Sequence, residues 1–139
     1  MLIRSLKPGA LALFLTGPAL LLLLLGGCQG WTMDYGRPAA QFEARDAIAL
    51  APDYLRKKVT VRGRISAVDT SDPERCIVKL DHGVTAHFGE FKAMAERYKV
   101  GEVIHVSGIV EAVNPSGITL DPAFGRDPKA PFAPLAPAP

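Results

Sequence analysis

Alternation of apolar and polar residues is the clearest pattern in the middle of the chain, and it predicts β-strands. Three stretches alternate in this way: KKVTVRGRISAV (residues 57–68), RCIVKL (75–80) and VTAHF (84–88). Successive side chains of a strand point to opposite faces, so one set of positions should face a core. These expected core positions are Val59, Val61, Ile65, Cys76, Val78, Leu80, Val84, Ala86 and Phe88. The DHG sequence between the second and third stretches predicts a tight hairpin turn.

Two other segments follow the helical period of 3.6 residues. Before the first strand, apolar residues recur at helical spacing at Ala40, Ala44, Ala47, Ile48, Ala51 and Leu55. This stripe predicts a helix that leads into the first strand and is interrupted near Pro52. After the third strand, a second stripe consists of Phe91, Met94, Ala95 and Tyr98. It predicts a short helix that ends near Gly101.

The stretches EVIHVSGIVEAV (102–113) and GITL (117–120) predict the last two strands, on either side of a turn at residues 114–117. The element order is then β-β-β-α-β-β, with Gly63 inside the first strand and Gly108 inside the fourth. Long strands bend at a glycine or bulge when they take part in both halves of a small closed barrel. The predicted fold class is therefore mainly β, a small five-stranded Greek-key barrel preceded by a helix, and it resembles an OB fold.

Two short motifs extend this resemblance to a family. Val59 to Ile65 fits the pattern V-x-V-x-G-x-V/I, and Gly101 to Gly108 fits G-D/E-x-V-x-V-x-G with Ile104 in place of the first valine. In these motifs the chain resembles the tRNA-anticodon-like OB-fold lipoprotein family over residues 42–121. The resemblance implies nucleic-acid-binding ancestry and does not establish an activity.

The N-terminal region has the order of a bacterial lipoprotein signal. Arg4 and Lys7 precede a dense apolar block at 19–25, whose length is typical of a signal-peptide core. Residues 25–28, Leu-Gly-Gly-Cys, then resemble a lipobox, which implies cleavage after residue 27 and lipidation, with palmitate among the acyl chains, of Cys28. A permanent transmembrane anchor is the alternative, because the uncharged run is long enough to span. No Lys/Arg cluster follows the run, which favours the lipoprotein signal.

The lipid would hold the mature protein on a membrane surface, since several acyl chains exceed the minimum for stable anchoring. Lipoproteins of Gram-negative bacteria usually stay in the inner membrane when Asp follows the lipidated cysteine, and here Gln29 follows it. The resemblance thus implies the cell envelope, on the periplasmic face of the outer membrane if the source is Gram-negative.

Composition divides the rest of the chain. Residues 28–38 are turn-rich and are expected to form a lipidated tether, and residues 39–124 the barrel with its leading helix. Residues 125–139 carry prolines at 128, 131, 134 and 137, and we expect a disordered Pro/Ala-rich tail, with a spacer or a ligand segment as alternatives.

Charge and cysteine content narrow the function classes. Lys and Arg number 16 against 14 Asp and Glu, and Arg4 and Lys7 belong to the predicted signal peptide, so the remainder is formally neutral. Neutrality disfavours general polyanion binding, which depends on counterion release. With Cys28 lipidated, Cys76 has no intrachain partner for a disulfide and is expected to be a buried core residue.

The candidate ligand site is the outer face of the first three barrel strands, which OB folds commonly use together with adjoining loops. Alternation places these residues there: Thr60, Arg62, Arg64, Ile77, Lys79, Thr85 and His87. The face is basic and hydroxyl-bearing but lacks the aromatic rings on which single-stranded nucleic acids stack. We therefore expect an envelope protein or a glycan as partner, with nucleic acid disfavoured and a solvated face without ligand left open.

No catalytic or metal-binding pattern is visible. His82, His87 and His105 do not have the spacing of a metal cluster. The loop DTSDPER (69–75) superficially suggests calcium but lacks the glycine and the terminal glutamate of a calcium loop. We expect a lipid-anchored, non-catalytic binding module without a cofactor.

Overall fold

The computed structural model describes residues 37–139. The predicted signal peptide (1–27), Cys28 and nearly all of the predicted tether lie outside the described residues. No helix within 37–139 is long and apolar enough to cross a membrane. Residues 38–139 form one compact unit.

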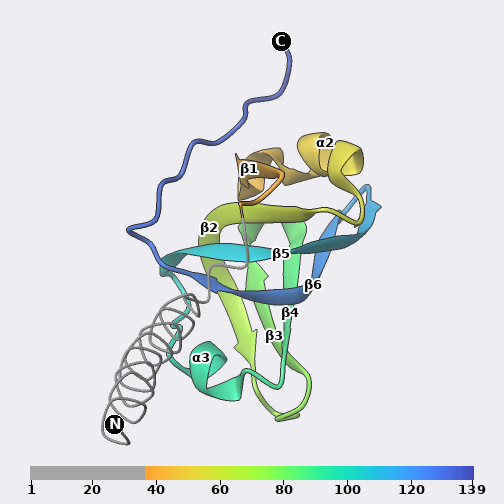
Figure 1. Ribbon diagram of the computed structural model, residues 1–139. Coiled ribbons are helices and arrows are strands. Elements are labelled where there is room, and N and C mark those ends of the chain that lie inside the picture. Colours follow the sequence, from red (N-terminus) through yellow and green to blue (C-terminus); the bar gives the residue numbers. More distant parts are fainter. Residues whose placement is uncertain (1–36) are drawn as a thin grey trace, which may run out of the picture. The chain divides into compact units, whose positions relative to one another are not determined.

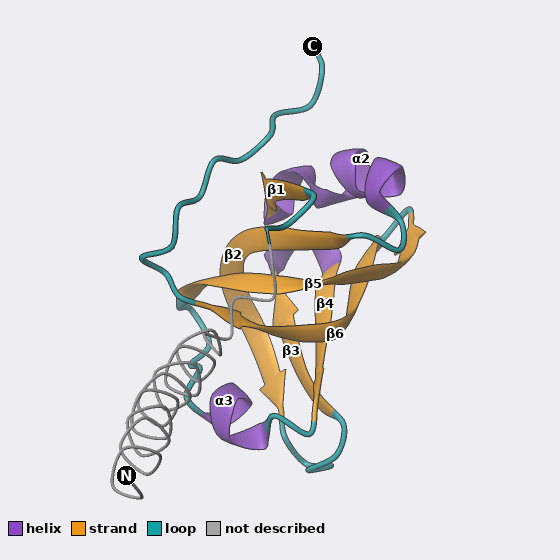
Figure 2. Ribbon diagram, viewed as in Figure 1, coloured by secondary structure: helices purple, strands orange, loops and turns teal. Residues whose placement is uncertain are grey.

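The described chain is a strand-rich unit with short helices (Figures 1 and 2). Its strands are β1 (Ala40–Glu43), β2 (Lys58–Asp69), β3 (Cys76–Leu80), β4 (Val84–Gly89), β5 (Val103–Asn114) and β6 (Gly117–Arg126). Its α-helices are α2 (Ala47–Leu50) and α3 (Lys92–Glu96), and its 3₁₀ turns are η1 (Ala44–Asp46), η2 (Ala51–Tyr54) and η3 (Asp81–Gly83).

Five strands close into a barrel. The sheet order is β1-β2-β3-β4-β6-β5, and β5 pairs back onto β2. All barrel pairings are antiparallel except β4 with β6, which is parallel. The order β-β-β-α-β-β and this closure are those of an OB fold, so the predicted fold class is confirmed.

The predicted strand faces are confirmed on the core side. Each of the nine residues expected to point inward from β2, β3 and β4 is at most 2% exposed. β5 and β6 contribute the core residues Ile104, Val106, Val110, Ile118, Leu120 and Ala123. The expected turn between β3 and β4 is η3, in which His82 adopts a positive φ of 69°.

The predicted leading helix is wrong at its start. Residues 40–43 form β1, which pairs in parallel with β2 from Ala40↔Val59 to Glu43↔Arg62. Phe42 is fully buried there, in a burial pattern of period two that four residues are too few to reveal in the sequence. Residues 44–54 are helical but broken into η1, α2 and η2, with Pro52 in the first turn of η2. Ala44, Ala47 and Ala51 are buried as the stripe predicts, whereas Ile48 and Leu55 are exposed.

The last strand is longer than predicted. GITL is only its first part, because β6 continues to Arg126 and pairs with β5 as far as His105↔Arg126. The boundary predicted after residue 124 therefore falls inside a strand. The segment beyond it contacts the sheet through a bridge between Leu135 and Phe42.

The predicted helix after β4 is confirmed as α3, which is shorter than the stripe. Ala95 is fully buried, and Met94 and Tyr98 pack against the core. The Tyr98 ring meets Phe88 edge to face, with centroids 5.9 Å apart. The helix thus covers one end of the barrel, as its position below β3 and β4 in Figure 1 shows.

The glycine in β2 allows the strand to change partners. Residues 59–62 of β2 pair with β1 along one edge, whereas residues 65–69 pair with β3 along that same edge. A Cβ on Gly63, at this junction, would lie 2.8 Å from the Ala44 Cβ and 3.1 Å from Leu80 Cδ1. The absence of a side chain lets η1 approach the bend.

We predict that Gly63→Ala lowers the free energy of unfolding by about 1–3 kcal/mol, the usual cost of overpacking a filled site. Adding Ala44→Gly removes the closest contacting atom and should restore part of the loss. Urea unfolding of the two variants and the wild type measures both effects. If the single variant were as stable as the wild type, η1 would not pack closely on the bend.

Candidate functional site

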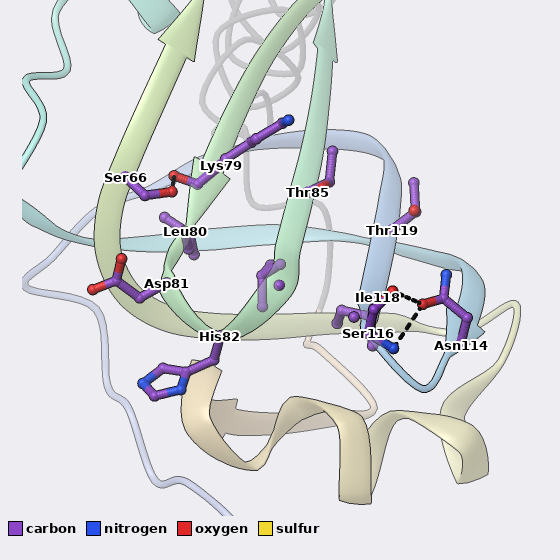
Figure 3. Close-up of a pocket in the computed structure, with 13 residues that line it drawn as sticks. Ser66, Lys79, Leu80, Asp81, His82, Thr85, Asn114, Ser116, Ile118 and Thr119 are labelled. Carbon is purple, nitrogen blue, oxygen red and sulfur yellow. Dashed lines mark hydrogen bonds between the residues drawn. The ribbon is translucent and has the colours of Figure 1, made fainter.

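A pocket of about 430 Å³ lies on the outer side of β3, β4 and β6 (Figure 3). In barrel order, β3 and β4 are the second and third strands, whose outer face is the usual ligand surface of OB folds. The pocket is lined by Ser66, Lys79, Leu80, Asp81, His82, Gly83, Val84, Thr85, Asn114, Ser116, Gly117, Ile118 and Thr119. Its size falls within the range of roughly 300–1,000 Å³ that is common for small-molecule sites.

One cross-strand row provides the polar wall of this pocket. Lys79 is opposite Thr85 in the β3–β4 pairing, and Thr85 is opposite Thr119 in the β4–β6 pairing. Figure 3 shows the two threonines on adjacent strands, with the Lys79 chain extended on the same side. On the other side of Lys79, the Ser66 hydroxyl donates to the Lys79 carbonyl at 3.3 Å. The row therefore presents two hydroxyls and one ammonium group.

Two turns form the floor of the pocket. The backbone of Gly83 in η3 contacts that of Ser116 and Gly117 so closely that neither glycine has room for a Cβ. Asn114 orders the second turn, because its Oδ1 accepts from the Ser116 amide at 3.0 Å and from the Ser116 hydroxyl at 2.7 Å. The side chains of Asp81 and His82 point away from the row of Lys79 and the threonines (Figure 3).

The structure brings together only part of the predicted site. Lys79 and Thr85 are neighbours in the pocket, and His87 lies on the same β4 face, opposite Ile77 but outside the pocket. Arg64 is exposed and donates to the Gly101 carbonyl at 2.6 Å, at the loop before β5. It is not among the pocket residues.

Thr60 and Arg62 are in a different place from the predicted one. They belong to the half of β2 that pairs with β1 and β5, whereas Lys79 pairs with Ala67 in the other half. The expected contiguous patch of Arg62, Arg64 and Lys79 is therefore not formed. Thr60 alternates with the core residues Val59 and Val61 as predicted, but it is fully buried rather than exposed. Its hydroxyl lies 2.8 Å from that of Ser107 and accepts from Arg126 at 3.1 Å.

Arg62 belongs to a second polar group, which we call the basic row: Glu43, Arg62, His105 and Arg126. These residues are successive partners across β1, β2, β5 and β6. Arg62 donates to both carboxylate oxygens of Glu43, and this hydrogen bonding raises the pKa of the guanidinium above its ordinary value. The ring of Phe132 lies 4.8 Å from the Arg62 Cζ and stacks on the His105 ring at 4.8 Å.

His105 is the titratable group that is most enclosed in this row, at 8% exposure. Burial lowers the pKa of His105 below its usual value, and the positive charges of Arg62 and Arg126 lower it further. Glu43 opposes this effect. The imidazole Nδ1 is buried and has no hydrogen-bond partner among the described residues.

In the loop at residues 69–75, the carboxylates of Asp69 and Asp72 accept hydrogen bonds from the loop itself. The amide and the hydroxyl of Ser71 donate to Asp69, which lowers the pKa of Asp69, and the Glu74 amide donates to Asp72. Within residues 37–139, no group of three or more His, Cys, Asp or Glu side chains is placed to hold a metal ion. Cys76 is buried, as its inward parity predicts.

Several pocket residues were missed by the sequence reasoning. Thr119 has outward parity in GITL, so the alternation would have found it. Ser66 follows Ile65 but precedes a register shift at Ala67, which obscures its face. Asn114 and Ser116 were recognised only as turn residues, because the contact between their turn and η3 depends on the closed barrel.

No protein-family model and no curated protein matches the sequence. Among solved structures, the chain is similar to a "putative nucleic acid-binding lipoprotein" of Klebsiella pneumoniae, at 22% identity over 60% of this chain and 79% of that one, with a TM-score of 0.42. A second is a "putative aspartyl-tRNA synthetase" of Leishmania major, at 15% identity over 68% and 22% of the two chains, with a TM-score of 0.46. A third is the Stn1-Ten1 complex of S. pombe, at 18% identity over 67% and 82%, with a TM-score of 0.41.

The state of His105 predicts a pH dependence of stability. Because its pKa is lower in the folded than in the unfolded chain, the unfolded state binds more protons between those two values. The contribution of His105 is therefore fully present above about pH 6.5, the unperturbed value, and is lost as the pH falls toward the folded pKa. His105→Gln should flatten the dependence of unfolding free energy on pH in this interval.

The matched controls are His82→Gln and His87→Gln, at an exposed and a half-buried position. Both should keep the wild-type slope when urea unfolding is repeated from pH 7.5 down to about pH 5. If the unfolding free energy of His105→Gln depended on pH as steeply as that of the wild type, His105 would have the same pKa in the folded and unfolded states.

Proposed function

We propose that the chain is a lipid-anchored, non-catalytic binding module of the cell envelope, and that its pocket on β3, β4 and β6 binds a glycan. The observation that supports this most strongly is the pocket lining, which offers hydroxyls, an amide and one ammonium group. Each hydroxyl can both donate and accept, which matches the alternating requirements of a polyhydroxylated ligand. The pocket also occupies the face that OB folds commonly use for oligosaccharides and oligonucleotides.

The chemistry of the pocket favours a glycan over a protein partner. Protein interfaces gain most of their affinity from a few buried Trp, Tyr and Arg side chains. No phenylalanine, tyrosine, tryptophan or arginine from residues 37–139 lines this pocket. An envelope protein remains the alternative occupant of the wider β3–β4 face, where Ile77 and His87 extend beyond the pocket.

Single-stranded nucleic acid is the second candidate, suggested by the fold. Binding of this kind combines a positive groove with aromatic rings on which bases stack. Lys79 is the only Lys or Arg of the described residues that lines the pocket, and the lining also contains the acidic residue Asp81. Its lining therefore supports a nucleic acid less well than a glycan.

The glycan proposal predicts the effect of removing the two threonine hydroxyls. Thr85→Val with Thr119→Val keeps the β-branched shapes and should leave the melting temperature nearly unchanged. Loss of two hydrogen bonds, at about 1 kcal/mol each, should weaken binding about tenfold or more. Calorimetric titration of the full chain with soluble fragments of digested peptidoglycan measures this. Thr70→Val, in the loop between β2 and β3, is the matched control and should bind like the wild type.

Failure of the wild-type chain to bind these fragments, or equal binding by the double variant, would refute the glycan site. Titration with oligothymidylate at two salt concentrations tests the second candidate. Tight binding with a steep salt dependence would favour nucleic acid.

The envelope location rests on the N-terminal sequence, with Cys28 as the lipidated residue. Cys28→Ala should abolish incorporation of a labelled acyl-chain analogue and leave an uncleaved precursor. Cys76→Ala is the control, because Cys76 is buried in the barrel and should not accept an acyl chain. Equal labelling of the Cys28→Ala variant and the wild type would end the lipoprotein proposal.

A further inference from the structure

The C-terminal segment lies against the sheet on the side of β1, away from the pocket. We call residues 127–139 the strap, and Figure 1 shows this segment leaving β6 and passing β2 toward β1. The Leu135 amide donates to the Gln41 carbonyl at 2.8 Å. The Gln41 side chain adds two bonds, donating to the Pro131 carbonyl at 3.2 Å and accepting from the Ala133 amide at 2.7 Å. Phe132, between these contacts, reaches the basic row.

The strap covers a strongly polar part of the barrel surface. The basic row contains two guanidinium groups and one imidazole against a single carboxylate. Next to it, Thr60 and Ser107 are cross-strand partners that are at most 1% exposed. The ring of Phe132 lies over these polar side chains. A ring face attracts a cation, but it does not replace the hydrogen-bond acceptors that buried polar groups require.

Two groups of this surface lack the partner that their chemistry requires. The buried Nδ1 of His105 has no hydrogen-bond partner among residues 37–139. Arg126 donates to the Thr60 hydroxyl, but no carboxylate of the described residues forms an ion pair with it. Arg62, in contrast, already has Glu43. An anion near Arg126 and His105 would form an ion pair with the guanidinium and would accept a hydrogen bond from Nδ1 when this nitrogen carries the proton.

A phosphate group would supply this anion. Its oxygens accept several hydrogen bonds at once, and guanidinium groups and hydroxyls are the usual donors to phosphate in proteins. Arg126, the imidazole and the one hydroxyl of the Thr60–Ser107 pair whose proton is not used between them form such a set of donors on adjacent strands. We propose that the surface beneath the strap is a second binding site, for a phosphate group, and that the strap with Phe132 is its removable cover.

The strap can leave without opening the core. The buried apolar residues end at Ala123, so residues 127–139 contribute none of them. Pro131, Ala133 and Leu135, which hold the strap on Gln41, are themselves exposed. Because ligand and strap compete for the same surface, the apparent affinity of the site is its intrinsic affinity multiplied by the fraction of molecules with the strap displaced. Weakening the strap must therefore strengthen binding.

Changes to the strap and a change at Arg126 should move the affinity in opposite directions. Titration of the full chain, held in an uncharged detergent, with inorganic phosphate is followed by the NMR signals of the His105 imidazole. Phe132→Ala should increase the apparent affinity, and a chain ending at Ala130 should do so at least as much. Arg126→Ala should decrease it about tenfold, the effect of losing one charge-assisted hydrogen bond. Bound phosphate should also raise the pKa of His105.

Phe91→Ala and Arg75→Ala are matched controls, since they remove an exposed ring and an exposed guanidinium elsewhere on the surface. Both should bind phosphate like the wild type. A parallel titration with glycerol phosphate distinguishes the source of the ligand: binding comparable to that of inorganic phosphate supports a lipid headgroup, and binding of inorganic phosphate alone supports the free ion.

Three results would overturn the proposal. The first is an affinity that neither Phe132→Ala nor truncation at Ala130 increases. The second is an equal loss in Arg126→Ala and Arg75→Ala, which would show unspecific attraction by surface charge. The third is equal binding of acetate, which would show that the surface does not select phosphate.

Discussion

The bend of β2 at Gly63 is the constraint on which the rest of the fold depends. On one side of it, β2 pairs with β1 and β5, and beyond it the edge that β1 occupied is taken by β3. Such an exchange requires the strand to coil sharply within a few residues, which a glycine permits. Without it β3 would not continue the sheet from the edge where β1 ends, and the barrel would not close through β4, β6 and β5.

The same bend separates two surfaces of different chemistry. The half of β2 beyond Gly63 leads to the pocket, with its neutral hydroxyls and single ammonium group. The half before it carries Arg62, which belongs to the basic row with its two guanidinium groups and buried imidazole, and Thr60 lies next to that row. The sequence pattern predicted one face for Thr60, Arg62, Arg64 and Lys79. Alternation of side chains describes a straight strand, and it does not show at which residue the strand paired with β2 changes from β1 to β3.

The core could be predicted from the sequence because burial in a strand follows a local period of two. Val59, Val61 and Leu80 are each identified by the polar residues on both sides of them. The burial of Thr60 could not be predicted in this way, since its hydroxyl bonds to Ser107, 47 positions away, and Arg126, 66 positions away. Phe42 belongs to a strand too short to show a period, among alanines that fit a helix equally well. Of the predicted site residues, Lys79 and Thr85 line the pocket. The floor of the pocket could not be predicted, because its two turns contact each other only in the closed barrel.

Closure of the barrel also determines how this chain must fold. The pairing of β2 with β5 that completes it joins residues far apart along the chain, with a separation of 47 residues for Thr60 and Ser107. Topologies dominated by such distant pairings fold slowly, in milliseconds to seconds, because long loops must close before any contact offsets their lost entropy. Until β6 arrives, the edges of β4 and β5 that it joins expose unpaired backbone groups to neighbouring chains. Incomplete molecules of this protein are therefore the ones that should aggregate, and a chaperone that shields strand edges would act on the chain at that stage.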